Sequence, residues 1–385
     1  MVIILHKEPN SGLSRKDMKW YNMHMQKTSN YFFSADIIRT VAIILVVLIH
    51  VFSEFLNYPK ALNTPDWWIA DVLNSGARIA VPLFIMLSGM LLLHSEKKYT
   101  FKEFFTKRLS KIGIPILAWP IIYFIWKAWF GHSQYSVYSI IRDYINLNIY
   151  YHLYYLYIII ALYFLTPIIK AAITNAPKEL KQYFTGLTLL FSLVLTAASY
   201  FLQININLST IFTVFIPFLG YYLVGDYIRH KTLSKKELYL YLVSFLVLMI
   251  ATALGTRWHM SYVFDVGLGK HSVDYGKYFY DYTSITVAAM SIMAFVMLHT
   301  VSEKIKNINN SRLSAFIMSF AGTSFGIYLV HPLILAVSNK YLGTGFSQVT
   351  VPLWIMIFIK LAGVLIISYM IVWIIKKIPI LKFIV

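Results

Sequence analysis

The chain has 385 residues, of which 58% are hydrophobic and only 13% are charged, which excludes a soluble globular protein of this size. Its formal net charge is +18, but the basic residues form short clusters between long apolar segments and the sequence contains no nucleic-acid-binding module. Nucleic acid is therefore not expected as a partner. The sequence has no cysteine, which excludes disulfides, thiolate metal ligands and an acyl-cysteine intermediate.

Apolar segments of near-spanning length recur along the whole chain. We count about ten, at residues 36–56, 76–94, 108–130, 152–173, 183–203, 208–228, 238–256, 283–301, 315–338 and 352–375. With this number of spans, the Lys- and Arg-rich clusters fall on one side of the bilayer, which the positive-inside rule identifies as cytoplasmic. These clusters cover residues 97–111, 229–236, 304–312 and 376–382. We expect an all-α integral membrane protein with about ten transmembrane helices and both termini in the cytoplasm.

The chain is predicted to consist of a short N-terminal tail followed by one membrane domain. Residues 1–33 are polar and basic, and they lack the apolar core and cleavage site of a signal peptide. We expect them to be a cytoplasmic N-terminal tail. Residues 34–385 contain no fixed-period repeat, low-complexity tract or soluble domain. The basic cytoplasmic rim would face anionic lipid of the bilayer.

The first predicted span carries four ionisable residues in an otherwise apolar run, namely Asp36, Arg39, His50 and Glu54. At about 100° per residue, the spacing R-x10-H returns Arg39 and His50 to nearly the same helix face, roughly 16 Å apart along the axis. Ionisable side chains inside a span generally mark a pathway or a reacting site, because only a partner or a water-filled cavity makes them tolerable. This stripe is the first candidate functional site.

His50 lies about two-thirds of the way across the span, and Glu54 follows one turn later on the same face. A carboxylate beside an imidazole fixes its tautomer and stabilises its protonated form, which favours a general base. A packing histidine capped by Glu54 is the structural alternative. Arg39 also has an ordinary alternative, since a basic residue near the cytoplasmic end of a span often only anchors the helix.

The second predicted span runs from outside to inside and places Arg78 near the depth of His50. Arg78 could pair with Glu54, stabilise a developing oxyanion, or anchor the helix at the outer interface. Ser88 and Gly89 lie near the inner end. They suit close helix packing, and the functional alternative is a narrow passage for a slender ligand arm.

Arg108 and Lys111 are one turn apart at the cytoplasmic start of the third predicted span. A pair of cations in this place could bind phosphate groups. Ordinary positive-inside charge explains the same residues without a ligand.

Two further histidines, His152 and His331, fall in other spans at a depth similar to that of His50. The three could converge on one cavity or form separate hydrogen bonds between helices. No close pair of His or carboxylate residues has the spacing of metal ligands, so no metal is expected. Trp67 and Trp68, in a predicted outer loop, could stack on a sugar or anchor the loop at the interface.

Several of these motifs together resemble acyltransferase family 3. They are D-x2-R-x10-H at Asp36 to His50, then RIAVPLFIMLSG, KRLSKI, YHLYYLY and SFGIYLVHPLI, in the family's order and on equivalent spans. The resemblance extends from about Ser34 to the last span. Within the family, NSGARIAVPLFIMLSG and YHLYYLYIIIALYFLTPII are most similar to enzymes that O-acetylate the enterobacterial common antigen.

The resemblance implies a multi-pass enzyme of the bacterial cytoplasmic membrane. It would transfer an acyl group, most simply acetyl, from cytoplasmic acyl-CoA to a hydroxyl of a cell-surface or lipid-linked glycan. By this resemblance His50 is the catalytic base or acyl carrier and Arg39 helps to hold the donor, with Ser88 near its path. Arg108 and Lys111 occupy the position of an arginine pair, R-x-x-R, but lysine at the second position loses bidentate phosphate binding.

Two other function classes fit the same residues. In a transporter or flippase for a polysaccharide intermediate or a small anion, the buried charges would line a translocation pathway. In a structural subunit of an envelope-synthesis complex, Arg39 and His50 would be dispensable. A homo-oligomer or association with envelope-synthesis partners is compatible with either class and with the enzyme.

Overall fold

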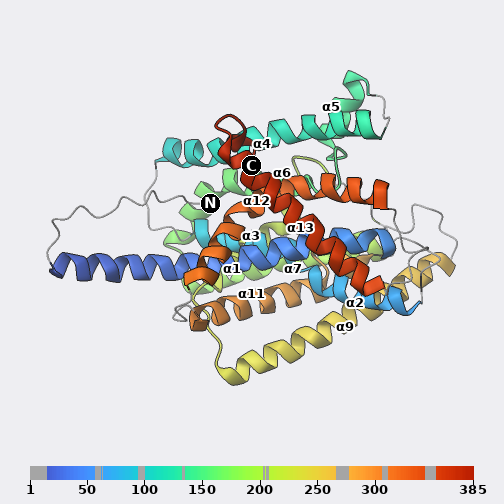
Figure 1. Ribbon diagram of the computed structural model, residues 1–385. Helices are drawn as coiled ribbons and strands as arrows, with labels where there is room; N and C mark the ends of the chain where they lie inside the picture. The colour runs from blue at the N-terminus through green and yellow to red at the C-terminus, as the bar shows by residue number, and fades with distance from the viewer. Residues whose placement is uncertain are drawn as a thin grey trace.

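The computed structural model describes residues 15–56, 62, 64–93, 100–131, 135–202, 204, 208–265, 277–305, 311–342 and 353–385. Regular secondary structure within these ranges is helical, without strands. Most of the long helices are labelled in Figure 1. The helices are α1 (Arg15–Leu56), α2 (Pro65–Ala77), α3 (Ala80–Leu92), α4 (Phe101–Phe130), α5 (Val137–Ile145), α6 (Tyr154–Thr174), α7 (Lys178–Phe201), η2 (Ile216–Phe218), α8 (Leu219–Tyr227), α9 (Lys235–Asp265), η3 (Tyr278–Tyr280), α11 (Ile285–Ile305), α12 (Ser311–Leu342), α13 (Leu353–Lys377) and η4 (Leu381–Ile384). In this described part of the chain, nine segments are long and apolar enough to span a bilayer, which confirms an all-α membrane protein.

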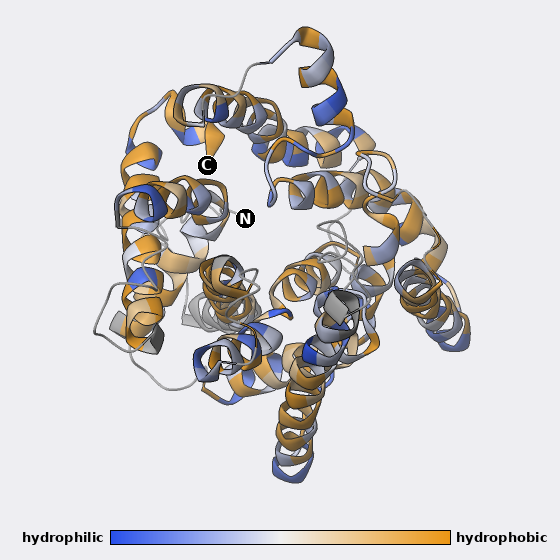
Figure 2. Cartoon of the chain, turned by 90° about the vertical axis from the view of Figure 1, so that its right-hand side faces the viewer, coloured by the Kyte–Doolittle hydropathy of each residue, from blue (hydrophilic) through white to orange (hydrophobic). Residues whose placement is uncertain are grey.

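Helix α1 forms the centre of the bundle. It packs against α2, α3, α11, α12 and α13, and half of its spanning segment is buried inside the protein. By contrast, only 6% of the span of α7 and 11% of that of α9 are buried, so these helices lie at the lipid-facing periphery. Figure 2, a view turned by 90°, shows most helices end-on and predominantly apolar. Helix α1 already begins at Arg15, so the predicted tail is helical from that residue onward.

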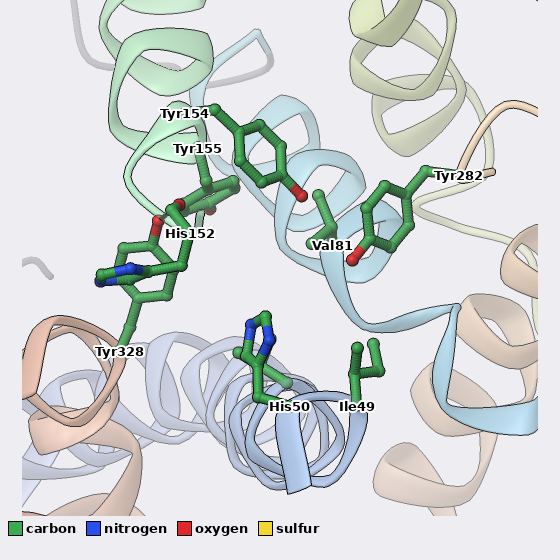
Figure 3. Close-up of a pocket in the computed structure, with 9 residues that line it drawn as sticks. Ile49, His50, Val81, His152, Tyr154, Tyr155, Tyr282 and Tyr328 are labelled. Carbon is green, nitrogen blue, oxygen red and sulfur yellow. Dashed lines mark hydrogen bonds between the residues drawn. The ribbon is translucent and has the colours of Figure 1, made fainter. Parts of the chain in front are cut away.

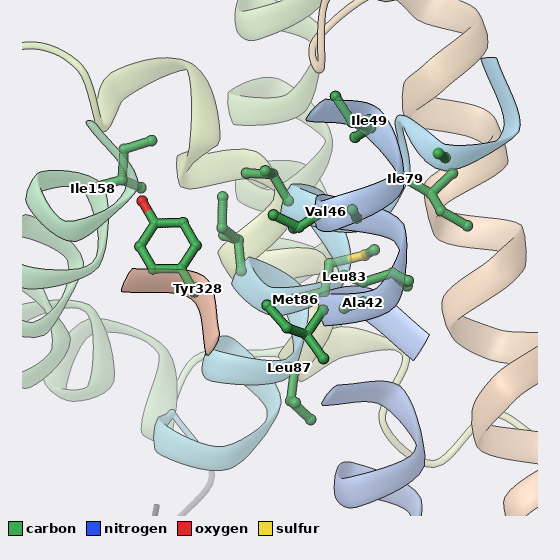
Figure 4. Close-up of a cluster of buried hydrophobic side chains, with 14 of the residues drawn as sticks. Ala42, Val46, Ile49, Ile79, Leu83, Met86, Leu87, Ile158 and Tyr328 are labelled. Atoms are coloured by element: carbon green, nitrogen blue, oxygen red, sulfur yellow. The ribbon is translucent and has the colours of Figure 1, made fainter. Parts of the chain in front are cut away.

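The packing of α1 against α3 is a close apolar contact. Ala42, Val46 and Ile49 of α1 are spaced three and four residues apart and therefore lie on one stripe. They face Leu83 and Met86 of α3 (Figure 4), and all five side chains are buried. Because lipid tails are as apolar as these side chains, the contact is stabilised by van der Waals packing rather than by removal of apolar surface from water. This contact holds α1, which carries Arg39 and His50, against α3, which forms the second part of the second span.

The predicted outer loop that contained Trp67 and Trp68 is wrong, because these residues lie in helix α2. The side chain of Thr64 accepts a hydrogen bond from the Trp67 backbone N–H, and Pro65 occupies the first helical turn. A threonine N-cap followed by proline is a strong start signal for a helix. The helix therefore begins well before the predicted span at 76–94.

The second span is broken at Arg78 and Ile79, which separate α2 from α3. Pro82 explains the break, since it has no N–H to donate to the carbonyl of Arg78 and its ring crowds that carbonyl. The Arg78 N–H still bonds to the Asn74 carbonyl at 3.1 Å, so α2 ends in a regular way. The discontinuity places Arg78 at a bend beside the first span.

The sixth predicted span, 208–228, is not one long helix. Its first half consists of turns, followed by η2 and the short helix α8. Pro217 begins the short 3-10 helix η2, and Gly220 approaches the backbone of α7 so closely that an added Cβ would lie 2.7 Å from the Leu189 Cα. The prediction failed because uniform apolarity does not distinguish a continuous helix from turns that pack inside a bundle.

Helices α3 and α8 touch through their backbones at two glycines. A Cβ on Gly89 would lie 1.8 Å from the Tyr222 carbonyl oxygen, and a Cβ on Gly225 would lie 1.9 Å from the Met86 carbonyl oxygen. Small residues at such contacts allow helices to approach within backbone distance. The pair of glycines thus fixes the position of α3, and with it the bend at Arg78.

Replacement of Gly225 with alanine is expected to destabilise the folded protein, because the added methyl group meets a backbone carbonyl and no rotamer change relieves the clash. Overpacking of this kind costs about 1–3 kcal/mol or more, which should appear as a lower Tm in detergent. Gly186→Ala is the matched control, since nothing lies within 4 Å of its Cβ position. Equal Tm values for the two variants would contradict the backbone contact.

Candidate functional site

Three histidines from three separate segments meet inside the bundle. The rings of His50 (α1) and His331 (α12) are stacked with centroids 5.3 Å apart. The His152 ring, just before α6, lies edge-on to the His331 ring at 5.6 Å. Tyr151 approaches His50 from the other direction, with ring centroids 4.7 Å apart. The structure therefore brings together the three histidines that the sequence analysis selected.

A proline in α12 shapes the surroundings of His331. Pro332 has no N–H, so the carbonyl of Tyr328 loses its helical donor. The neighbouring carbonyls receive side-chain hydrogen bonds instead: His331 Nδ1 lies 3.0 Å from the Ile327 oxygen, and the Tyr123 hydroxyl donates to the Leu329 oxygen at 2.8 Å. Because a carbonyl only accepts, His331 carries its proton on Nδ1 and presents Nε2 as an acceptor.

Several nitrogen atoms of this cluster are buried without a partner. Within the described residues, His331 Nε2 and both ring nitrogens of His152 make no hydrogen bond. The backbone oxygen of His152 accepts a hydrogen bond from the Tyr328 hydroxyl, which fixes the segment but leaves the ring unpaired. Buried polar atoms are generally hydrogen-bonded, so these nitrogens are available to water or to a polar ligand.

A small cavity adjoins His50 and His152 (Figure 3). Its walls are formed by Val46, Ile49, His50, Val81, His152, Tyr154, Tyr155, Tyr282 and Tyr328. The cavity has a volume of about 10 Å³, which is room for about one water molecule. Any larger ligand enters only when lining side chains move apart.

Arg78 lies behind one wall of this cavity. Its guanidinium carbon is 4.4 Å from the ring centroid of Tyr280 and 6.0 Å from that of Tyr282, and it is within electrostatic range of His50. The Tyr280 hydroxyl in turn donates to the fully buried carboxylate of Asp71. Sequence analysis missed Asp71 and Tyr280, because only the fold brings together residues so far apart in the chain.

The predicted donor-binding cations gather near the end of the bundle that the sequence analysis assigns to the cytoplasm. Arg39 forms an ion pair with Asp36 at 2.8 Å, and the guanidinium of Arg108 lies 5.8 Å from the Tyr163 ring centroid. Arg39 and Arg108 are both within electrostatic range of Lys111. Arg39 also interacts with Tyr155, which lines the cavity, so the basic cluster and the cavity are connected through α6.

The remaining predicted site residues lie elsewhere. Trp67 is 1% exposed and packs edge-on against Trp68 at 5.6 Å on α2, and neither residue lines the cavity. The Ser88 hydroxyl donates to the Phe84 carbonyl at 2.9 Å within α3. The Glu54 side chain lies outside the described residues. The roles assigned to these four residues stay predictions.

The part of the chain that the structure describes contains no group of three or more His, Cys, Asp or Glu side chains arranged to hold a metal ion.

Two tyrosines of the cavity, Tyr154 and Tyr155, were visible in the sequence within the run YYHLYYLY, but an aromatic belt at the membrane interface has the same pattern. Tyr328 lies in the motif SFGIYLVHPLI but was not singled out there, and Tyr282 carried no local signal.

Spanning helices around buried imidazoles and phenols define a polytopic membrane protein with an enclosed polar site. The family model for the acyltransferase domain of acyltransferase family 3 matches residues 32–373, a range that extends from α1 into α13. The chain therefore belongs to acyltransferase family 3 and is a membrane acyltransferase. Comparison with curated proteins gave no match, and comparison with solved structures gave none either.

Tyr328→Phe tests the hydrogen bond that fixes the His152 segment. Loss of the hydroxyl leaves a buried carbonyl without this donor, which typically costs about 1–3 kcal/mol of unfolding free energy, so we expect a lower Tm in detergent. Tyr341→Phe is the control on the same helix, because that side chain is 72% exposed. The same Tm for both variants would show that the Tyr328 hydroxyl does not support the site.

Proposed function

We propose that this membrane acyltransferase moves an acyl group, acetyl in the simplest case, from cytoplasmic acyl-CoA to a hydroxyl of a cell-surface or lipid-linked glycan. The observation that carries the proposal is the placement of His50 and Arg39 on one stripe of α1. His50 borders the cavity, and Arg39 lies among the cytoplasmic cations. Such an enzyme would work in the bacterial cytoplasmic membrane.

The donor would bind with its phosphates on Arg39, Arg108 and Lys111. Guanidinium groups suit phosphates because they offer several N–H donors in a fixed fork. The Coulombic link from Arg39 to Tyr155 supports a path for the pantetheine arm between α1 and α6 toward the cavity. Since Arg39 and His50 are roughly 16 Å apart along the helix, a donor held at the cytoplasmic end would need its long arm to reach the imidazole.

The chemistry would depend on a nitrogen lone pair of His50. In direct transfer, His50 removes the proton from the acceptor hydroxyl, whose oxygen attacks the thioester carbonyl carbon. The carbon–sulfur bond then breaks, and the proton passes from His50 to the departing CoA thiolate. In the alternative route His50 itself attacks and carries the acyl group until the sugar oxygen displaces it. Both routes consume one thioester and one alcohol and yield one ester and one thiol.

The acceptor would bind on the side of His152 and His331. The unpaired nitrogens of these two rings are suited to hydrogen bonds with sugar hydroxyls. If the predicted membrane orientation holds, these rings lie toward the outer side, which would suit an acceptor that is exported or lipid-linked. The small volume of the cavity, about 10 Å³, would also limit the access of bulk water to the thioester and so limit hydrolysis.

His50→Ala is expected to lower acyl transfer by about 10²- to 10⁴-fold, the usual contribution of a general base, or to abolish it if His50 carries the acyl group. The measurement is transfer of radiolabel from acetyl-CoA to a lipid-linked glycan in proteoliposomes. His230→Ala is the matched control, because this exposed histidine bonds to Arg229 outside the spanning helices.

A His50→Ala protein that retains full turnover would contradict this scheme. Uptake of unmodified glycan without label transfer by the wild-type protein would instead support a transporter. Tm values measured for both variants separate a loss of chemistry from a loss of folding.

Arg108→Gln is expected to raise KM for acetyl-CoA about tenfold with little change in kcat. A charge-assisted hydrogen bond contributes about 1.5–3 kcal/mol, and each 1.4 kcal/mol is a factor of ten in affinity. Lys178→Gln, an exposed lysine at the start of α7, is the control for simple loss of positive charge. If both variants have the same KM, Arg108 does not bind the donor. Acetyl-dephospho-CoA lacks the phosphate on the ribose. If Arg108 contacts that phosphate, the KM values of wild type and Arg108→Gln should differ less with this donor than with acetyl-CoA.

A further inference from the structure

Two tyrosines meet on the wall of the cavity that faces His50. Tyr154 is the first residue of α6, and Tyr282 lies in the short segment between η3 and α11. Figure 3 shows their hydroxyl groups directed toward one another across the cavity from the His50 ring. Both side chains line the cavity, and they are close enough to interact electrostatically. Two O–H groups thus converge on one point opposite the imidazole.

The backbone of Tyr282 is fixed on both sides. Its carbonyl accepts a hydrogen bond from the Tyr221 hydroxyl. The preceding Asp281 carboxylate accepts from the backbone N–H and the hydroxyl of Thr283, each at 2.8 Å. These contacts hold the Tyr282 backbone in place, while its side-chain hydroxyl pairs with that of Tyr154 beside the cavity.

The positively charged side chain of Arg78 lies near the two tyrosines but outside the cavity. The guanidinium of Arg78 lies 6.0 Å from the Tyr282 ring centroid and within electrostatic range of Tyr154. Its own position is determined by the Tyr280 ring at 4.4 Å and by the Asp71 carboxylate, to which Tyr280 donates. Arg78 does not line the cavity, so it acts on the cavity's contents through the tyrosines.

We propose that Tyr154 and Tyr282 are catalytic residues that donate hydrogen bonds to the carbonyl oxygen of the acyl group as it is attacked, with Arg78 as their positioning residue. The inference rests on the proposed acyl transfer at His50. Attack on a thioester carbonyl places negative charge on its oxygen, and preorganised donors at that oxygen are usually the largest single source of rate acceleration. A phenol is neutral near pH 7 and keeps its O–H for this purpose.

The positions of these side chains define which groups would lie on each side of the acyl carbonyl carbon. The acyl carbon would lie between the His50 ring and the paired hydroxyls, so that the attacking group approaches from the His50 side and the oxygen turns toward Tyr154 and Tyr282. The tyrosine protons are shared with the oxyanion and are not transferred. The other two tyrosines of the wall are less suited, because the Tyr328 hydroxyl already donates to the His152 carbonyl and the Tyr155 ring packs against Phe84.

Tyr282→Phe and Tyr154→Phe should each lower kcat about 10²- to 10³-fold, the usual cost of one oxyanion donor, with KM for acetyl-CoA changed less than threefold. Tyr369→Phe is the matched control, since it removes a hydroxyl bonded at 2.8 Å to Ser319 on another side of the bundle. Tm values measured in parallel separate lost chemistry from lost folding. Turnover of both cavity variants within twofold of the wild type would overturn the inference.

Two further measurements keep the test decisive if a phenylalanine variant folds poorly. Replacement of Tyr282 by 3-fluorotyrosine, a stronger hydrogen-bond donor of similar size, should leave kcat at or above the wild-type value, and a fall to the phenylalanine level would overturn the inference. Arg78→Met should lower kcat in the wild-type background but much less in the Tyr282→Phe background, because the two residues act together. Strict additivity would show that Arg78 does not act through Tyr282.

These results are distinguishable from failure of the proposed function. If the wild-type protein transfers no label from acetyl-CoA to the glycan, the proposed function with this donor and acceptor is refuted. If the wild-type protein transfers label and His50→Ala does not, whereas the tyrosine variants keep full kcat, then only the oxyanion donors are refuted.

Discussion

The stacked pair of His50 and His331, with ring centroids 5.3 Å apart, is the contact on which the arrangement of the site depends. Polar rings inside a bilayer-spanning bundle are tolerated only when they face one another, a hydrogen-bonding group or a cavity. Here the imidazoles of α1 and α12 stack on each other, and His152 completes the cluster from the start of α6. A separation of these helices would leave each histidine against lipid or apolar side chains. The functional groups therefore also determine how the central helices pack.

Prolines place the reactive groups at points where helix backbones are interrupted. Pro82 breaks the second span and brings Arg78 to a bend, and Pro332 disturbs α12 next to His331. Near Pro332 the carbonyls of α12 accept hydrogen bonds from the side chains of His331 and Tyr123, as is common where spanning helices line a site. The close glycine contacts of α3 with α8 then prevent the bend at Arg78 from relaxing. Local helix defects and tight neighbouring packing together produce a rigid polar wall.

Much of the fold could be predicted from sequence, because long apolar runs and clustered Lys and Arg are strong local signals. The stripe of Arg39 and His50 was visible for the same reason: helix periodicity relates residues that are close in the chain. The interaction of Asp71 with Tyr280, or of Arg78 with Tyr282, joins different segments across the bundle and leaves no local pattern. The region 208–228 misled prediction because turns buried by neighbouring helices can be as apolar as a spanning helix.

The small volume of the cavity, about 10 Å³, bears on how the site could exclude water. A reactive thioester is safest when the groups that activate it are assembled only around the bound acyl chain. The rigid elements are those fixed by backbone contacts, namely α3 with α8 and the Tyr282 segment. Helix α4, which carries Arg108, packs mainly against α6 and η4, so it is held less tightly to the central helices. Arg108 and Lys111 on α4 thus lie on the less constrained side of the bundle, whereas His50 and the paired tyrosines lie on the constrained side. Under the proposed function, such a division would let the donor's arrival open a path without disturbing the groups around His50.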